Sequence, residues 1–160
     1  MIRPFRALAP LLLLTLATPL SARDSLGVFG QWAAFRDAEV PRCYAIAAAN
    51  GDGSAGFATV AAWPDRQVRG QVHFRLSRSV DPEARIALVV GGESFVLTAA
   101  ARNAWASDGA GDSAIIAAMR AATTMQVRGR DRAGRAFSDS YPLDGAATAI
   151  DAAVVGCAQG

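Results

Sequence analysis

Alternation of apolar and polar residues with a period of two is the feature that most constrains how this chain can fold. In residues 71–78 the alternation places Val72, Phe74 and Leu76 on one side, which is typical of a half-buried β-strand. The same pattern, less regular in places, predicts further strands at 29–36, 42–48, 57–63, 86–90, 95–97, 125–127 and 136–141. Glycine clusters separate these segments, and Gly91-Gly92 predicts a two-residue hairpin loop. We therefore expect a mainly β fold, an antiparallel β-sandwich or flattened barrel.

Two segments follow the helical period instead. The first is a short internal helix with Asp112 as its predicted N-cap, and its apolar positions are Ile115, Ala118, Met119 and Ala122. The second is a C-terminal helix that starts after Asp144 and stops near Gly156, with an apolar face ending at Cys157. We expect the C-terminal helix to pack on the β-structure.

The first 22 residues have the layout of a secretory signal peptide. Residues 1–6 carry two arginines and no acid, residues 7–20 are uncharged, and Ser21-Ala22 provides a small-residue exit. The apolar stretch is shorter than the roughly 20 residues that a membrane-spanning helix needs. We predict cleavage after Ala22, which leaves residues 23–160 as a single exported β-rich domain, periplasmic or secreted and without a membrane span. An uncleaved membrane anchor is the alternative.

Removal of this segment changes the charge balance. The full chain has 16 basic and 14 acidic residues, and Arg3 and Arg6 leave with the signal peptide. The mature domain then has no net charge. Domains that bind nucleic acid usually carry a basic excess, so we do not expect a nucleic-acid partner.

The two cysteines lie near the two ends of the mature domain. In an oxidising compartment, an even pair such as Cys43 and Cys157 predicts a disulfide bond. A redox-active pair would more often have the close Cys-x-x-Cys spacing. The pair is therefore interpreted as a structural link.

The sequence lacks the residue patterns of the common active sites. His73 is the only histidine, and it lies on the polar side of its strand, where we expect an exposed imidazole rather than a metal ligand. The chain has no lysine and no Gly-x-Ser-x-Gly turn, and no glycine-rich stretch continues into a phosphate-binding loop. We assign no catalytic residue, no metal site and no cofactor.

Arginines on the polar sides of the predicted strands are the main interaction candidates. If these strands pair, they form a basic surface that could meet an anionic envelope component or an acidic patch on an envelope protein. The candidate surface consists of Arg75, Arg78, Arg128, Arg130 and Arg132. A solvated face balanced by local acids is the alternative. The three tryptophans, Trp32, Trp63 and Trp105, are interpreted as packing residues rather than a ligand platform.

Several short segments resemble the invasion-associated locus B family of small exported proteins of Gram-negative bacteria. They are Gly30-Gln31-Trp32, Arg42-Cys43-Tyr44, the hairpin at 89–96, the helical 112–119 and the closing stretch 141–149. The chain resembles a distant member, because Ala146 replaces an aromatic residue and the additional cysteines of the family are missing. The resemblance implies a β-sandwich, a periplasmic or envelope location and a non-enzymatic role in envelope function or host-cell entry.

Three functional hypotheses remain from the sequence. The first is a non-catalytic binding module of the periplasm or envelope. The second is a small exported hydrolase or isomerase with a carboxylate-based site, which a deep polar pocket holding two acids would support. The third is a structural subunit, which a large exposed apolar patch would support.

Overall fold

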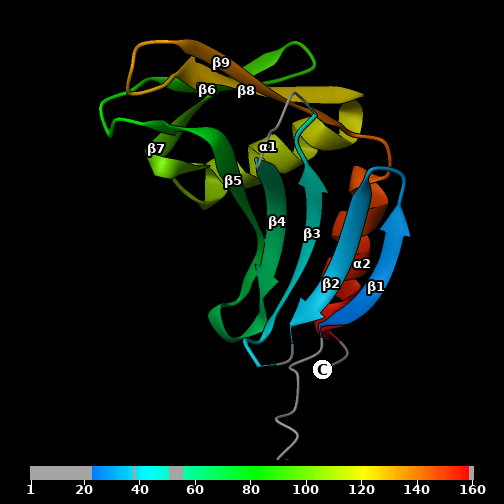
Figure 1. Ribbon diagram of the computed structural model, residues 1–160. Coiled ribbons are helices and arrows are strands. Elements are labelled where there is room, and N and C mark those ends of the chain that lie inside the picture. Colours follow the sequence, from blue (N-terminus) through cyan, green and yellow to red (C-terminus); the bar gives the residue numbers. More distant parts are fainter. Residues whose placement is uncertain (1–22, 38, 51–55, 159–160) are drawn as a thin grey trace, which may run out of the picture.

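The computed structural model describes residues 23–37, 39–50 and 56–158, so the predicted signal peptide lies outside the described residues (Figure 1). The described residues form nine strands and two α-helices, so the fold is mainly β as predicted. The strands are β1 (Asp24–Phe29), β2 (Trp32–Asp37), β3 (Arg42–Ala48), β4 (Phe57–Trp63), β5 (Val68–Val80), β6 (Ile86–Val90), β7 (Glu93–Trp105), β8 (Thr124–Arg130) and β9 (Ala136–Pro142). The helices are α1 (Gly109–Ala121) and α2 (Ala146–Ala158), and a 3₁₀ turn spans Pro64–Arg66.

All nine strands belong to one open antiparallel sheet with the order β1-β2-β3-β4-β5-β7-β6-β8-β9. The long strand β7 joins two halves, because its beginning pairs with β6 and its end pairs with β5. Ala101, where β7 meets the end of β5, has a left-handed backbone with φ of 52°. The larger half is β1–β5 with the end of β7, and the smaller half is the start of β7 with β6, β8 and β9. The hairpin at Gly91-Gly92 is confirmed, since Val90 pairs with Glu93.

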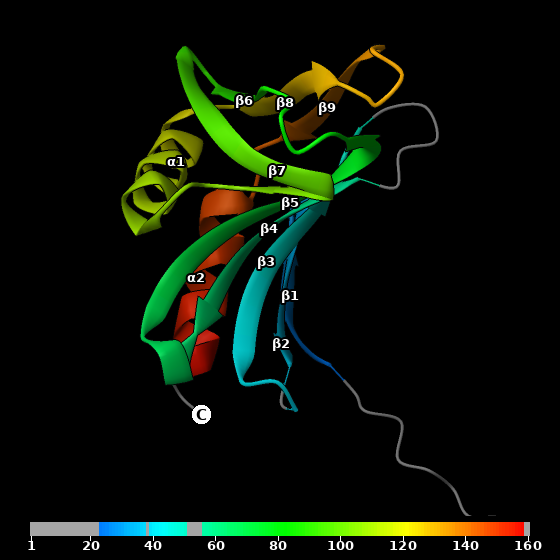
Figure 2. The same ribbon diagram turned by 90° about the vertical axis from the view of Figure 1, so that its left-hand side faces the viewer.

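The core lies between the inner face of the sheet and the two helices. Val72, Phe74 and Leu76 point into it, as the alternation predicted, and all three are buried. Figure 2 shows the larger half curving around α2, with the smaller half leaning over its upper end and α1 beside the junction. Helix α2 contacts β1 to β4, whereas α1 contacts β5, β6, β7 and α2. The opposite face of the larger half, here called its outer face, is not covered by either helix.

The helical faces agree with the sequence, but two boundaries do not. Ile115, Ala118 and Met119 are buried on α1, and the predicted inner face of α2 is buried at Ala146, Ala149, Ile150 and Ala153. The predicted N-cap of α1 is wrong. The side chain of Asp108 accepts a hydrogen bond from the amide of Gly111 at 2.8 Å, so Asp108 is the N-cap and Asp112 lies inside the first turn. Helix α2 also continues through Gly156.

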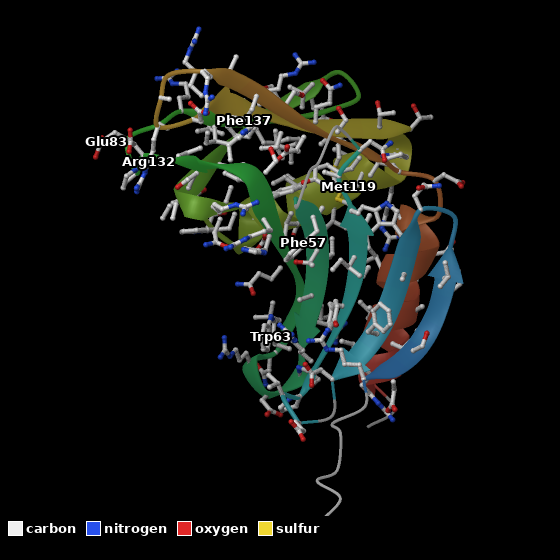
Figure 3. The ribbon with its side chains drawn as sticks, viewed as in Figure 1. Phe57, Trp63, Glu83, Met119, Arg132 and Phe137 are labelled. Atoms are coloured by element: carbon white, nitrogen blue, oxygen red, sulfur yellow. A yellow bond between two sulfur atoms is a disulfide. The ribbon has the colours of Figure 1, made fainter. Side chains whose placement is uncertain are left out.

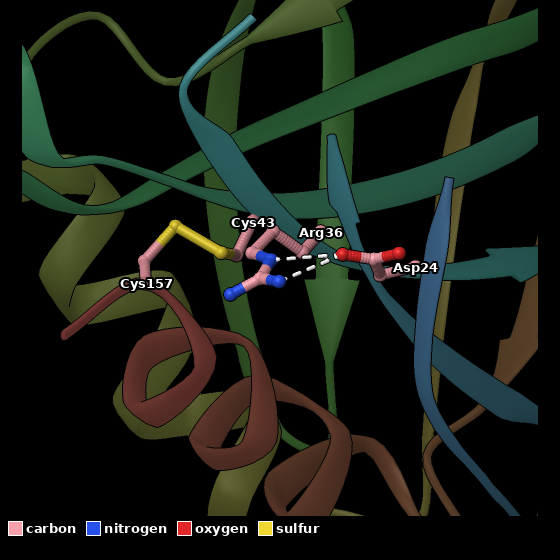
Figure 4. Close-up of a disulfide and its surroundings, with 4 residues drawn as sticks. All are labelled: Asp24, Arg36, Cys43 and Cys157. Atoms are coloured by element: carbon pink, nitrogen blue, oxygen red, sulfur yellow. Dashed lines mark hydrogen bonds and ion pairs between the residues drawn. A yellow bond between two sulfur atoms is a disulfide. The ribbon is translucent and has the colours of Figure 1, made fainter. Parts of the chain in front are cut away.

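The predicted disulfide joins Cys43 on β3 to Cys157 near the end of α2, across 114 residues of sequence (Figure 4). Cys43 is fully buried, and the two Cα atoms are 5.6 Å apart. Close by, the guanidinium of Arg36 on β2 meets the carboxylate of Asp24 on β1 at 2.8 Å. The bond therefore fixes the last turn of the C-terminal helix to the inner face of the sheet.

Two buried carboxylates complete the hydrogen bonding of β5 where β7 does not pair with it. Asp112 accepts a hydrogen bond from the amide of Val72 at 2.8 Å, one residue before the β5–β7 pairing begins. Asp139 on β9 accepts one from the amide of Ser77 at 2.9 Å, within the interruption of the same pairing. A buried amide without a partner would cost about 1–3 kcal/mol, so both acids have a structural role.

Replacing Asp112 is expected to show this role and a dependence on pH. Burial raises the pKa of the Asp112 carboxyl, against the lowering effect of the Val72 hydrogen bond, and the charge of Asp108 raises it further. The folded protein thus holds this proton more tightly than the unfolded chain does. The contribution of Asp112 to stability is largest below the ordinary carboxyl pKa and is lost as pH rises through the raised value.

Urea unfolding from pH 3 to pH 7 measures both effects. Asp112→Ala is expected to lower the free energy of unfolding by about 1–3 kcal/mol at neutral pH, because the Val72 amide loses its acceptor. Asp112→Asn keeps an acceptor oxygen but cannot titrate. It is expected to lose less and to gain stability relative to the wild type as pH rises. A wild type that instead gained on Asp112→Asn with rising pH would contradict the assignment.

Candidate interaction surfaces

The five arginines of the predicted surface occupy three places in the structure. Arg128 and Arg130 are exposed on β8, on the side of the smaller half that faces away from the core. Arg78 near the end of β5 and Arg132 in the β8–β9 turn line a common cleft. Arg75 lies apart from them on the outer face of the larger half, where it donates a hydrogen bond to Asn103 at 3.4 Å.

Two of these places are part of larger groups of arginines. One group contains Arg128 and Arg130, and the other contains Arg78 and Arg132. Arg128 and Arg130 line a cleft of about 500 Å³ together with Arg85 from the β5–β6 loop. Arg78 and Arg132 line a cleft of about 360 Å³ together with Arg102 and Arg135. The β8–β9 turn contributes to the second of these clefts, and the ends of the two strands that it joins contribute to the first. We call these residues the arginine belt: Arg78, Arg85, Arg102, Arg128, Arg130, Arg132 and Arg135.

Acidic side chains neutralise only part of the arginine belt. Arg132 pairs with Asp81 at 3.3 Å, and Arg135 pairs with Asp131 at 2.9 Å. Figure 3 shows Arg132 and Glu83 at the same end of the smaller half.

In the cleft lined by Arg128 and Arg130, fewer acidic side chains balance the positive charge. Arg128 donates to the Gln126 side chain, and Arg130 donates to the carbonyl of Gly134 at 2.8 Å. Within the described part of the chain, Arg85, Arg128 and Arg130 have no carboxylate partner. Their cleft therefore carries three guanidinium groups whose charge no described carboxylate balances.

Three members of the belt were not predicted from the sequence. Arg85 lies one residue before β6, and Arg135 lies one residue before β9. Arg102 lies in β7, and its guanidinium donates to the carbonyl of Leu76 at 3.0 Å. The sequence could have pointed to Arg85 and Arg135, because each of them directly precedes a predicted strand. Only the path of β7 across β5 places Arg102 in the belt.

The outer face of the larger half carries aromatic and polar side chains that the sequence analysis treated as packing or exposed residues. Trp32 is indeed buried, and its Nε1 donates to the carbonyl of Pro142 at 2.9 Å. Trp63 and Trp105 lie on the outer face instead, at two ends of a cleft of about 460 Å³. His73 lines the same cleft and is half-buried rather than exposed, with its Nε2 at 3.2 Å from Oδ1 of Asn103.

A carboxylate-based enzyme would require two acids that meet in a polar pocket. Asp37 and Asp65 line a cleft of about 340 Å³ beside Cys157. Asp37 is partly buried and pairs with Arg42 at 3.4 Å, and Asp65 is exposed. The buried Asp112 and Asp139 bond to amides five residues apart on β5, about 16 Å along the strand. Within the described ranges, no two buried acids therefore lie together as the enzyme hypothesis requires.

The described residues contain no cluster of three or more His, Cys, Asp or Glu side chains able to hold a metal ion. None of the helices in the described ranges is long and apolar enough to cross a membrane.

Comparisons with known proteins identify the family of this chain. No curated protein matches its sequence significantly. The crystal structure of invasion associated protein B from Bartonella henselae matches with a TM-score of 0.62 and 14% identity, over 84% of this chain and 98% of the other, which shows a common fold. The model of the family described as Invasion associated locus B (IalB) protein matches residues 37–154, well over half of the chain. The chain therefore belongs to the invasion associated locus B family.

Proposed function

We propose that this protein is a non-catalytic binding module of the bacterial envelope, and that its arginine belt binds a phosphate-bearing envelope component. We further propose that residues 1–22 are removed on export and that residues 23–160 act in the periplasm or outside the cell. The disulfide bond supports an oxidising location, because such bonds persist mainly outside the cytosol. Membership of the invasion associated locus B family supports the same location.

The cleft around Arg85, Arg128 and Arg130 is the observation that carries the binding proposal. Its described lining contains three guanidinium groups and no carboxylate. Guanidinium groups match the geometry of phosphate and carboxylate oxygens and can bind them through two parallel hydrogen bonds. Uncompensated cations at one end of a domain with no net charge would also orient that end toward an anionic surface.

Binding to phosphate-bearing probes tests this proposal. The disulfide-bonded protein is mixed with phosphatidylcholine vesicles, with the same vesicles containing phosphatidylglycerol, and with purified lipopolysaccharide. We expect binding to at least one anionic probe, weakening with added salt, and no binding to phosphatidylcholine alone. In the double variant Arg128→Gln/Arg130→Gln, affinity is expected to fall about 10- to 30-fold, since each arginine near an anionic surface contributes about 1 kcal/mol.

A second double variant controls for net charge. Arg23 and Arg69 are both exposed and form no ion pair among the described residues. Arg23→Gln/Arg69→Gln removes the same charge as the belt variant, but it is expected to keep most of the affinity. Equal losses in the two variants would indicate a general charge effect. Failure of the wild type to bind either anionic probe would contradict the proposal.

A further inference from the structure

The cleft between Trp63 and Trp105 shares no lining residue with the clefts of the arginine belt. It lies on the outer face of the larger half, and its lining includes Arg42, Thr59, Gln71 and His73. Figure 3 shows Trp63 and Phe57 on this face, which is turned away from α2. None of the described residues that line the cleft is acidic.

The strand register explains why these side chains meet. Thr59 on β4, His73 on β5 and Trp105 on β7 are directly paired neighbours, so they form one row across three strands. Ala61 and Gln71 form the next row. Neighbouring strands are about 4.8 Å apart, and paired residues point to the same face of the sheet. The small side chains of Thr59 and Ala61 thus leave a hollow beside the larger ones.

Contacts within the sheet hold the polar groups of the cleft in place. Nε1 of Trp63 donates to Oε1 of Gln71 at 3.0 Å. The guanidinium of Arg42 lies 5.5 Å from the centre of the Trp63 ring, and that of Arg66 lies 4.8 Å from it. Because both guanidinium groups already contact the Trp63 ring, this side chain forms a fixed side of the cleft and orients Gln71. Trp105 has no ring, cation–π or Nε1 hydrogen-bond contact with other described side chains, so its indole is available.

Besides the guanidinium of Arg42, whose buried Nε has no hydrogen-bond partner, the Gln71 amide and the His73 ring have hydrogen-bonding groups to offer a ligand. Oε1 of Gln71 is used by Trp63, so the amide NH₂ group remains as a donor. Oδ1 of Asn103 also accepts a hydrogen bond from Arg75. It therefore acts as an acceptor toward His73 as well, and Nε2 of His73 must carry the hydrogen. Nδ1 of His73 is left as an acceptor. Burial lowers the pKa of His73, against the effect of the Asn103 hydrogen bond, and Arg75 lowers it further, which keeps the ring neutral.

We propose that this cleft binds a pyranose ring of a carbohydrate. An apolar indole beside a fixed donor and a fixed acceptor matches a sugar, whose ring has an apolar C–H face and hydroxyl groups that both donate and accept. Trp105 stacks on the C–H face, and Gln71 and His73 bind adjacent hydroxyl groups. This site is separate from the arginine belt and does not depend on the function proposed for the belt.

The three indole N–H signals in a ¹H–¹⁵N correlation spectrum provide the test, because the chain contains only three tryptophans. The probes are the methyl glycosides of glucose, galactose, mannose and N-acetylglucosamine, each titrated into the disulfide-bonded protein. We expect at least one of them to shift the Trp105 and Trp63 signals saturably. The Trp32 signal is expected to stay in place, because this indole is buried and bonded to Pro142.

Variants separate specific binding from general effects. Trp105→Ala is expected to abolish the shift of Trp63, and Gln71→Ala is expected to weaken binding about fivefold, as for the loss of one hydrogen bond. Gln71 is exposed, so this variant tests the site even if Trp105→Ala fails to fold. Arg128→Gln/Arg130→Gln is expected to bind as the wild type does. The proposal is overturned if no glycoside shifts Trp105, if all three indoles shift together, or if both cleft variants retain full binding.

Discussion

Loss of the Cys43–Cys157 bond is expected to lower the free energy of unfolding by about 4–5 kcal/mol. The bond closes a loop of 114 residues, and in the chain-entropy account a link of this length restricts the unfolded chain by about that amount. Since a domain of this size is typically stable by about 5–15 kcal/mol, the loss is a large fraction of the total. The double variant Cys43→Ala/Cys157→Ala is preferable to a single change, which would leave one thiol free to react.

Urea unfolding of the double variant and of the wild type, with and without reductant, measures this effect. Alanine at position 43 fits its surroundings, since Ala45 and Ala47 already face α2 from the same strand. We expect a lower midpoint and a larger m value, because the unlinked chain exposes more surface on unfolding. Reductant should lower the wild type to the same midpoint and leave the variant unchanged. Equal midpoints for oxidised wild type and variant would show that the link adds no stability.

The parts of this fold that sequence predicted well are those in which one face of an element is buried. In β5, the alternation of Val72, Phe74 and Leu76 with polar residues has only one arrangement that buries the apolar set. In α2, the helical period leads from Ala146 to Cys157 along one side, so the same face carries both the packing and the disulfide. In each case, a local pattern and a tertiary contact require the same geometry.

Sequence patterns failed in two situations. In the first, the local sequence is unusual for the structure that it adopts. In the second, residues distant in sequence meet only through the register of paired strands. Gly109 and Gly111 are poor helix formers, and they concealed the true start of α1 at Asp108. The cleft on the outer face combines Thr59, His73 and Trp105, which are paired across three strands but distant in sequence. Of these three strands, only β5 showed recognisable polar outward positions in the sequence. Which residues of β4 and β7 lie beside them is set by the registers of the β4–β5 and β5–β7 pairs.

Two of the segments that resemble the family meet at one structural joint. The β1–β2 hairpin contains Gly30-Gln31-Trp32, and the link from β9 to α2 contains residues 143–145. The amide of Gln31 donates to the carbonyl of Asp144 at 3.2 Å, close to the bond between Trp32 and Pro142. These residues therefore hold the β1–β2 hairpin against the segment that leads into α2. They do not form part of either surface proposed here for binding.

Replacing Gly145 with alanine is expected to destabilise this joint by about 2–5 kcal/mol. Gly145 has φ of +82°, a left-handed conformation that costs a residue with a Cβ about 1–2 kcal/mol. A Cβ at this position would also overlap the carbonyl of Phe29. Because that neighbour is backbone in a hairpin held to β9 and α2, it cannot move aside freely, and overpacking adds about 1–3 kcal/mol.

Gly134 provides the matched control for this prediction. It has φ of +76°, close to that of Gly145, but a Cβ there would meet no atom within 4 Å. Gly134→Ala is therefore expected to cost only the conformational penalty, about 1–2 kcal/mol. The difference between the two variants in urea unfolding measures the close approach of the hairpin to Gly145. Equal losses would mean that the hairpin yields to the added methyl group, and the joint would then be a loose contact rather than the fixed seat of α2.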